Sequence, residues 1–385
     1  MISQNFATGH RSAIRHRPPA LGPRRISVIV AGTVVGVVAV WGPAAAAPGT
    51  PSDRGAHTHG YVQTNLVADQ PGVAAITDPN LVNPWGLSEG PTTPIWVSGN
   101  GADVATLYSG DTAGLMVKAA PLVVRIPAGA PTGQVFNDTT SFVLPDGAPA
   151  RFLFASEAGT LTGWNPQLQP ITSAVTVATS PDAVYKGLAL LHTNGSAQLL
   201  AADFHHGRID VFDSNFQRVR LRQGAFSDPR LPAGYAPFDV AVVGGRVFVT
   251  YAQQDALRHD DVAGSGHGFI DVYAPNGKLV QRFARRGVLD SPWGLAIAPA
   301  GFGRFSGDLL VGNFGDGLIH VFDPMTGRFM GTVNDQWGHA IRIDGLWGLL
   351  PGNGVASDPA AVWFSAGPNH EQNGLLGTLR LAAGG

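Results

Sequence analysis

A tripeptide, Trp-Gly-Leu, occurs three times in this chain, and its spacing constrains the fold more than any other feature. It stands at Trp85, Trp293 and Trp347, in the stretches NPWGLSEGP, SPWGLAIAP and GLWGLLPGN. The first two tryptophans are 208 residues apart and the last two are 54 apart. Since four periods of about 52 residues span the longer gap, the spacing predicts a repeated unit of that length. Apolar stretches indeed begin where this period places them, at 137–144, 185–192 and 238–245.

Each unit contains two further runs of β-branched and aromatic residues. The second run of each unit lies at 95–100, 152–158, 199–207, 247–253, 309–317 and 362–367. The third lies at 104–110, 161–166, 209–215, 270–277, 319–327 and 376–381. Short runs joined by Gly, Asn and Asp are typical of antiparallel strands linked by tight turns. Six such units predict an all-β protein, a six-bladed β-propeller.

A fourth strand completes most of the predicted blades. Five units carry a further strand-like run, at 121–127, 171–178, 217–223, 278–284 and 328–333. The sixth unit reaches the end of the chain without one, whereas the run YVQTNLVAD (61–69) precedes the first unit. We therefore expect four-stranded antiparallel blades, with the strand at about 61–69 closing the ring as the outer strand of the last blade, because this pairing protects an open edge. The propeller domain is expected to span 61–385.

The first 46 residues resemble an export signal rather than part of the fold. Residues 1–25 hold five Arg and no acidic residue, and the apolar run 26–42 and the small-residue stretch PAAAAP follow them. This order predicts a secretory signal peptide over 1–46, followed by a flexible linker over 47–60. The competing interpretation is an uncleaved membrane anchor, and Arg24-Arg25 also suggests the twin-arginine route. We expect a secreted or extracytoplasmic protein with no membrane span after cleavage.

The charge balance and the lack of cysteine exclude several functional classes. Without residues 1–46 the chain keeps 20 basic residues against its 27 acidic ones, a net charge of −7. Nucleic acid is therefore excluded as a partner, because phosphate binding needs a clustered positive field. The absence of cysteine excludes disulfides, thiol catalysis and thiolate metal sites. We expect a monomer stabilised by burial of its core.

The segment 291–331 resembles an NHL repeat. It reads SPWGLAIAPAGFGRFSGDLLVGNFGDGLIHVFDPMTGRFMG, with Pro-x-Gly before one strand and a run of the type I-x-V-F-D in a later one. The whole of 61–381 further resembles a family of exported, uncharacterised bacterial NHL-like propellers, through TNLVAD, NPWGLS, YAQQDALRHDDVAGSGHGFIDVY and SPWGLA. More distant propellers include metal-dependent lactonases and lyases as well as binding modules. The resemblance therefore implies a fold and no single activity.

Polar residues are expected to gather at one mouth of the central channel. In a propeller, the loops that enter the inner strands and those that leave the second strands lie at the same end. The first set of loops supplies Asn83, Asn137, Asp138, Lys186, Asp239 and Asp344. The second set supplies Asn100, Glu157, Asp203, His205, His206, Asp255, Asn313, Asp316, Asn369, His370 and Glu371. Most Asp and Asn side chains in Gly-rich turns only satisfy local backbone groups, which is the alternative interpretation.

Four of these residues are candidate metal ligands, and two histidines are candidate catalytic groups. Carboxylate and amide oxygens suit Ca²⁺, the one cofactor that this set suggests, and the candidates are Glu157, Asp203, Asp239 and Asn313. A neighbouring His205 or His370 is the candidate general acid or base. Adjacent histidines on an extended segment face opposite sides and lack the spacing of a zinc helix, which disfavours zinc.

The longest interruption of the repeat is 252–268, after the second strand of the fourth unit. It carries Asp255, His259, Asp260, Asp261 and His267, without the order of an EF-hand loop. Long loops in compact domains tend to be functional, so the segment is a candidate ligand-binding loop or lid. A solvated charged loop is the alternative.

Two functional hypotheses from different classes follow. The leading one is a secreted or surface-associated NHL-like propeller that binds a ligand, protein or glycan through its loop-rich face. The alternative is a metal-dependent hydrolase or lyase, in which Ca²⁺ in the channel polarises an ester or lactone oxygen. A structural envelope protein without a small ligand is a third option. An enzyme needs three or four of the candidate side chains to converge on one point, whereas a binding protein needs a shaped, exposed surface.

Overall fold

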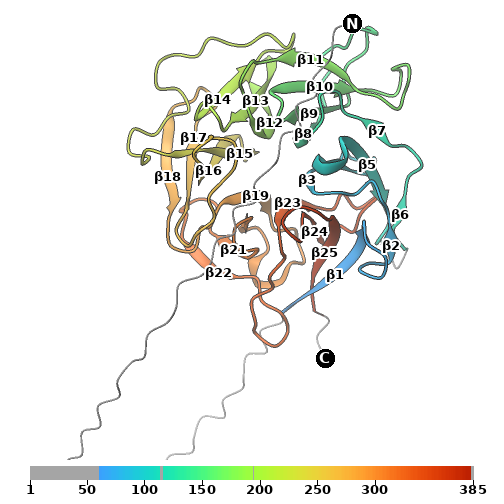
Figure 1. Cartoon of the computed structure of the whole chain (residues 1–385). Coiled ribbons are helices and arrows are strands. Elements are labelled where there is room, and N and C mark those ends of the chain that lie inside the picture. Colours follow the sequence, from blue (N-terminus) through green and yellow to red (C-terminus); the bar gives the residue numbers. More distant parts are fainter. Residues whose placement is uncertain (1–59, 113–115, 194, 383–385) are drawn as a thin grey trace, which may run out of the picture. The chain divides into compact units, whose positions relative to one another are not determined.

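The computed structural model describes residues 60–112, 116–193 and 195–382, which form six antiparallel sheets arranged around a central axis (Figure 1). No α-helix occurs among these residues; two short 3₁₀ turns, η1 (Asn100–Ala102) and η2 (Gly303–Phe305), lie in the first and fifth blades. In the described part of the chain, no helix is long and apolar enough to span a membrane. The predicted signal peptide and nearly all of the predicted linker lie outside the described residues.

The first three blades follow one another along the chain. The first contains β3 (Pro84–Ser88), β4 (Ile95–Gly99), β5 (Val104–Ser109), β6 (Lys118–Ala119) and β7 (Val124–Arg125). The second contains β8 (Pro131–Phe136), β9 (Phe152–Ser156), β10 (Thr160–Trp164) and β11 (Val175–Thr179). The third contains β12 (Tyr185–Thr193), β13 (Ser196–Asp203) and β14 (Arg208–Phe212).

The last three blades include the closure of the ring. The fourth contains β15 (Tyr235–Val243), β16 (Arg246–Gln253), β17 (Gly268–Tyr273) and β18 (Leu279–Arg285). The fifth contains β19 (Pro292–Ile297), β20 (Leu309–Asn313), β21 (Ile319–Phe322) and β22 (Phe329–Thr332). The sixth contains β23 (Leu346–Pro351), β24 (Val362–Ala366), β25 (Leu375–Leu381) and the N-terminal β1 (Tyr61–Ala68), to which β2 (Ile76–Thr77) adds a short parallel pair.

The predicted six-bladed propeller and its closure by the N-terminal strand are confirmed. β1 pairs antiparallel with β25, from Tyr61 opposite Leu381 to Ala68 opposite Leu375. The six inner strands contact one another in a closed cycle in the order β3, β8, β12, β15, β19, β23 and back to β3. The two ends of the domain are therefore held in one sheet, and the inner strands of neighbouring blades pack against one another.

Two strand predictions need correction. The inner strand of the second blade is β8, at 131–136, and not the predicted run 137–144. Pro131-Thr132-Gly133 carries the small residue that an inner strand needs, because a Cβ at Gly133 would collide with the backbone of β12. In the third blade, the run 217–223 forms a single bridge between Phe212 and Arg218 instead of a fourth strand.

The repeated Trp-Gly pairs fill the centre of the ring. The ring centroids of Trp85 and Trp347 stack 3.5 Å apart, and Trp293 meets the two edge-on, at 6.0 and 5.7 Å. Phe204, Phe238 and Phe314 join them in one apolar cluster. A cluster that draws on the first, third, fourth, fifth and sixth blades can only lie at the axis. It therefore blocks the channel, and the two mouths are separate surfaces.

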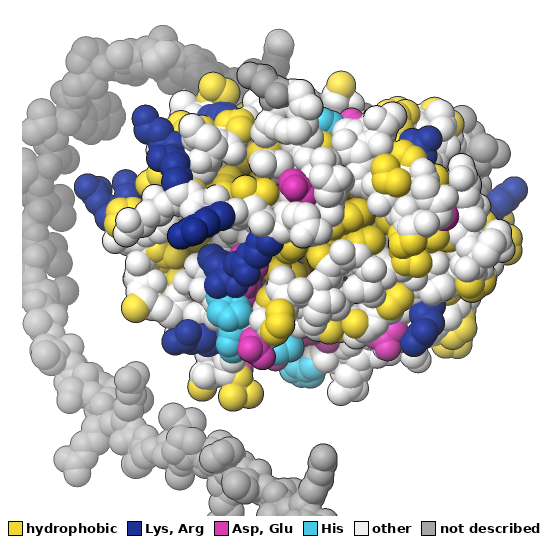
Figure 2. All heavy atoms as spheres, turned by 90° about the horizontal axis from the view of Figure 1, so that it is seen from above, with side chains coloured by type: hydrophobic (Ala, Val, Ile, Leu, Met, Phe, Trp, Pro, Cys, Tyr) yellow, Lys and Arg dark blue, Asp and Glu magenta, His cyan; other side chains and the backbone are white. Residues whose placement is uncertain are grey.

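The outer surface mixes charges of both signs. Seen from above (Figure 2), apolar side chains lie scattered among polar ones, and the basic side chains on one half of this face lie beside acidic and His side chains.

Candidate functional site

A buried lysine lies at the start of the third inner strand, directly over the aromatic cluster. Lys186 is 2% exposed, and its Nζ lies 5.1 Å from the centroid of the Trp85 ring. It forms an ion pair with Glu157 Oε1 and another with Asp260 Oδ1 at 3.2 Å. Burial lowers the pKa of Lys186, but the two carboxylates outweigh burial and hold the pKa above its ordinary value. The ammonium group is therefore charged at neutral pH.

Side-chain amides extend this ion pair across the mouth of the channel. Asn100 Nδ2 donates to Glu157 Oε2 at 3.0 Å, and Asn83 Nδ2 donates to Asn100 Oδ1 at 3.2 Å. Asn83 Nδ2 also donates to Glu371 Oε2 at 2.7 Å, while Trp347 Nε1 donates to Asn83 Oδ1 at 3.1 Å.

We call Lys186, Glu157, Asp260, Asn83, Asn100 and Glu371 the Lys186 network; it joins five of the six blades. Hydrogen bonds and ion pairs between side chains of separate blades therefore hold these groups together at the mouth.

Two backbone features of the network are strained. Asn369, His370 and Glu371 are all left-handed, with φ of 58°, 53° and 64°. Asn83 is left-handed as well, with φ of 44°. Such conformations cost about 1–3 kcal/mol each for residues other than Gly and are concentrated at binding and active sites. The left-handed turn, closed by a hydrogen bond from the Glu371 N–H to the Gly367 carbonyl at 3.1 Å, brings the Glu371 carboxylate to Asn83.

The predicted loop 252–268 supplies the exposed part of the site. Asp255 Oδ1 accepts the backbone N–H of His259 at 2.8 Å and that of Asp260 at 3.3 Å, which fixes the tip. His259 Nδ1 lies 2.9 Å from Asp260 Oδ1, and the two side chains are 45% and 67% exposed. Lys186 and His259 together lower the pKa of Asp260 despite its partial burial. Asp260 therefore presents an ionised carboxylate to solvent beside the channel mouth.

The other half of the loop is pinned to the fifth blade. His267 Nδ1 lies 2.9 Å from the Val262 carbonyl oxygen, and the Gly264 N–H donates to Asp290 at 2.6 Å. Burial raises the pKa of Asp261 to about 6, and its Oδ2 has no hydrogen-bond partner among the described residues. Of the five predicted loop residues, His259 and Asp260 therefore reach the network, Asp255 positions them, and Asp261 and His267 lie behind.

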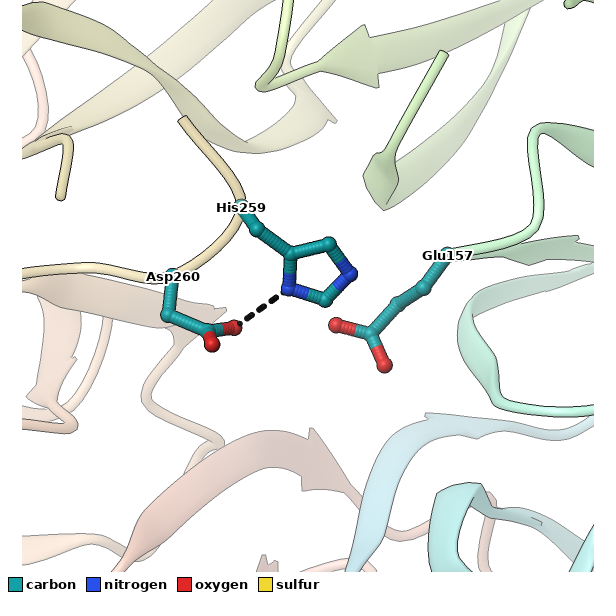
Figure 3. A group of neighbouring side chains, drawn as sticks. All are labelled: Glu157, His259 and Asp260. Carbon is teal, nitrogen blue, oxygen red and sulfur yellow. Dashed lines mark hydrogen bonds and ion pairs between the residues drawn. The ribbon is translucent and has the colours of Figure 1, made fainter. Parts of the chain in front are cut away.

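Only one group of potential metal ligands comes together among the described residues. Ligand atoms of Glu157, His259 and Asp260 lie within 4.8 Å of one another, with the His259 ring directed toward Glu157 across the gap between two loops (Figure 3). The Lys186 ammonium already lies against both carboxylates. Because Ca²⁺ takes six to eight oxygen ligands and a second cation here meets that ammonium, this donor set does not fit Ca²⁺.

The predicted calcium ligands Glu157, Asp203, Asp239 and Asn313 do not form one group in the described part of the molecule. Asp203 is taken by His206 at 2.8 Å and Arg208 at 3.2 Å. Asn313 donates to the Val288 carbonyl at 2.8 Å and to Asp316 at 3.1 Å. Asp239 lies below the mouth, inside the channel.

The two candidate catalytic histidines also stay outside the network. The His205 ring packs edge-on against His206, with centroids 5.0 Å apart, and His370 is exposed on the left-handed turn. Asn137 and Asp138 lie at the opposite end of their strand from the mouth, because β8 ends at Phe136. The sequence signal for Lys186 is a single charge in the apolar inner strand YKGLALLH, at the place where three other units carry Trp.

Comparisons with known proteins identify relatives. No family model matches the chain. It is 34% identical over 326 residues to the uncharacterized protein R648 of Acanthamoeba polyphaga mimivirus, across 82% of this chain and 78% of that protein. The uncharacterized protein L690 of the same virus is 34% identical over 324 residues, across 82% and 84% of the two chains. These relatives are viral, so the bacterial family that the motifs predicted is not shown by the comparisons.

A solved structure supports the fold. A glucose dehydrogenase superposes with a TM-score of 0.50 at 12% identity, covering 84% of this chain and all (100%) of that one. An identity this low supports the propeller architecture and carries no information on activity.

Proposed function

This chain belongs to the same family as the mimivirus proteins R648 and L690, and we propose that it is an exported, NHL-like propeller that binds a hydroxyl-rich ligand, such as a glycan, at the Lys186 network. One observation supports the proposal: the ammonium group of Lys186 is buried, while its carboxylate partners Glu157 and Asp260 lie at the loop-rich mouth of the channel. The export signal and the NHL character rest on the sequence patterns alone.

The exposed groups of the network determine the ligand chemistry. Asp260 is ionised and exposed, and Glu371 and Glu157 lie beside it, half-buried. Carboxylates accept hydrogen bonds, and charge-assisted bonds from hydroxyl groups are roughly twice as strong as neutral ones. A ligand that offers several hydroxyl groups therefore suits the site better than one that offers acceptors.

The rigidity of the floor favours binding as well. The network lies over stacked tryptophans that are at most 4% exposed, and its amides hold one another in place. A site that is already ordered loses little entropy when a ligand binds.

A glycan array probed with the full chain tests the proposal. We expect binding to at least one glycan, with about tenfold weaker binding after Asp260→Asn, since one charge-assisted bond is lost. Asp323→Asn is the matched control, because Asp323 also lies in a turn but in the fifth blade, where it accepts the N–H groups of Met325 and Thr326. Absence of binding above background, or equal binding by Asp260→Asn, would overturn the proposal.

A metal-dependent hydrolase or lyase is the second candidate. One observation favours it, the approach of Glu157, His259 and Asp260 to within 4.8 Å. The neighbouring Lys186 ammonium opposes it by charge repulsion. The two candidate functions differ in the metal content of the protein, which elemental analysis of the full chain measures.

A further inference from the structure

The channel contains a second recess, on the far side of the aromatic cluster from the Lys186 network. It has a volume of about 400 Å³ and is lined by all six inner strands. Its wall runs from the level of Gly86 and Trp293 to residues at the far ends of the strands, including Glu89 and His192. Since Lys186 lies at the beginning of β12 and His192 near its end, the recess opens at the opposite mouth.

One acidic side chain interrupts a ring of glycines at the deep end of the recess. Five inner strands carry Gly at the same step, namely Gly86, Gly133, Gly187, Gly294 and Gly348, and the fourth carries Asp239. A Cβ added to any of these five glycines would collide with the neighbouring inner strand. At Gly187, the colliding residue is Asp239. Packing around the axis thus favours Gly at this step. Asp239 is the exception, and its carboxyl lies on the surface of the recess.

The Asp239 carboxyl has no side-chain partner among the described residues. The side chain is 8% exposed, and no other side chain among the described residues forms a hydrogen bond or an ion pair with its oxygens. The backbone N–H of Asp239 donates to Thr250 Oγ1 at 2.9 Å. Burial raises the pKa of Asp239 well above its usual range; the backbone N–H of Val240 lowers this pKa, but no nearby cation does. Buried carboxyls normally have hydrogen-bond or ion-pair partners, so this one is available for a ligand.

The walls between the carboxyl and the mouth are aliphatic. Leu188, Val240, Leu295 and Leu349 are among the residues that line them. The mouth itself is acidic: Glu89 lies there, and Asp138 and His192 form a pair at 3.1 Å. Burial raises the pKa of Glu89 to about 7, although Ser357 donates a hydrogen bond to it. The recess therefore combines an apolar body with one deep carboxyl and further carboxyl groups at its mouth.

We propose that this recess binds a small organic ammonium ion, with the nitrogen paired to Asp239 and the apolar part against the aliphatic wall. A recess of this size is within the range of small-molecule pockets. A divalent metal suits it less, because Asp239 is the one carboxylate at the deep end and Ca²⁺ needs six to eight oxygen ligands. The proposal is independent of the function proposed for the Lys186 network.

Calorimetric titration of the full chain with n-butylammonium tests the proposal, with n-butanol as the neutral probe of the same shape. We expect one saturable site for n-butylammonium, about tenfold weakened or lost in Asp239→Asn and in Asp239→Gly, and no such difference for n-butanol. Asp239→Gly restores the ring of six glycines, so that at least one variant keeps the fold. Asp271→Asn is the matched control, because Asp271 is buried in the same blade but does not line the recess.

Three results would overturn the proposal. The first is no saturable binding of n-butylammonium, and the second is binding that both Asp239 variants retain. The third is saturable binding of Ca²⁺ that Asp239→Asn abolishes, which assigns the recess to a metal. Asp260→Asn is expected to bind n-butylammonium like the unmodified protein, which separates this site from the Lys186 network.

Discussion

At the scale of single residues, loss of Lys186 is expected to destabilise the protein strongly. Its ammonium is buried and paired with Glu157 and Asp260, so Lys186→Met leaves the Glu157 carboxylate without its countercharge. We expect the free energy of unfolding to fall by about 3–5 kcal/mol, as for other broken buried pairs. Urea unfolding measures the loss.

Two further variants check the cause of that loss. Lys278→Met removes an exposed lysine and is expected to change stability by no more than about 0.5 kcal/mol. The double variant Lys186→Met/Glu157→Gln is expected to recover part of the loss, since no unpaired charge remains. A Lys186→Met protein as stable as the original contradicts the assignment.

The raised pKa of Asp239 predicts how the free energy of unfolding depends on pH. Its pKa is raised in the native state, whereas an unfolded Asp titrates near 3.9, so the native state holds this proton more tightly. The contribution of Asp239 to stability therefore falls as pH rises from about 4 toward the native pKa, and Asp239→Asn removes this contribution. The difference in free energy of unfolding between the variant and the original protein is expected to grow in favour of the variant over this window. Urea unfolding at several pH values measures it, and a difference that is independent of pH contradicts the account.

Residue types at the mouth were predictable from the sequence, but their partners were not. The strand columns place Asn83, Asn100, Glu157, Lys186 and Glu371 at one mouth, and the structure joins them there. The pairing depends on how separate blades pack, which no local pattern encodes. Asp239 was predicted at the mouth and lies inside the channel, on the surface of the recess.

At the scale of elements, β1 anchors the N-terminal end of the domain. The Tyr61 ring packs on Phe302 with centroids 4.5 Å apart, and its hydroxyl donates to the Phe302 carbonyl at 2.9 Å. Tyr61→Ala is expected to lower the free energy of unfolding by about 3–5 kcal/mol, and Tyr61→Phe by about 1 kcal/mol. Val62→Ala, at a position 43% exposed in the same strand, is the control. Equal effects at positions 61 and 62, measured by urea unfolding, contradict the anchoring role.

The loop 252–268 depends on Asp255. Its carboxylate accepts the N–H groups of His259 and Asp260, and Arg258 next to them is exposed. Asp255→Ala is expected to speed tryptic cleavage after Arg258 several-fold, because cleavage needs a locally open backbone. Asp213→Ala removes a similar turn acceptor in the third blade and is expected to leave this cleavage unchanged. Mass spectrometry of the fragments follows the rate, and cleavage of Asp255→Ala at the original rate contradicts this role.

Strand boundaries were predictable where the repeat is regular. The period gives the inner strands at Trp85, Trp293 and Trp347 and the pairing of β1 with β25. It fails in the second blade, where Thr132 occupies the place of Trp and the chain from 137 to 150 forms an irregular excursion instead. There Asn137 Nδ2 donates to the carbonyls of Ser141 and Ala150, which stabilises a loop.

At the scale of the whole molecule, the aromatic cluster divides the channel into two independent mouths. One mouth holds a charged network with a fixed internal cation, and the other leads to a single buried carboxyl. Fold alone does not assign chemistry to either mouth, and the residues that do so come from different blades.

The central claim is that the Lys186 ammonium serves as the cation of the loop-rich mouth, which makes the protein a binding propeller rather than a metalloenzyme. Elemental analysis of the full chain, after equilibration with Ca²⁺ and removal of the free ion, tests this claim most directly. We predict far less than one Ca²⁺ per chain, and no change in Glu157→Gln. About one Ca²⁺ per chain, lost in Glu157→Gln, would contradict the claim and favour the hydrolase.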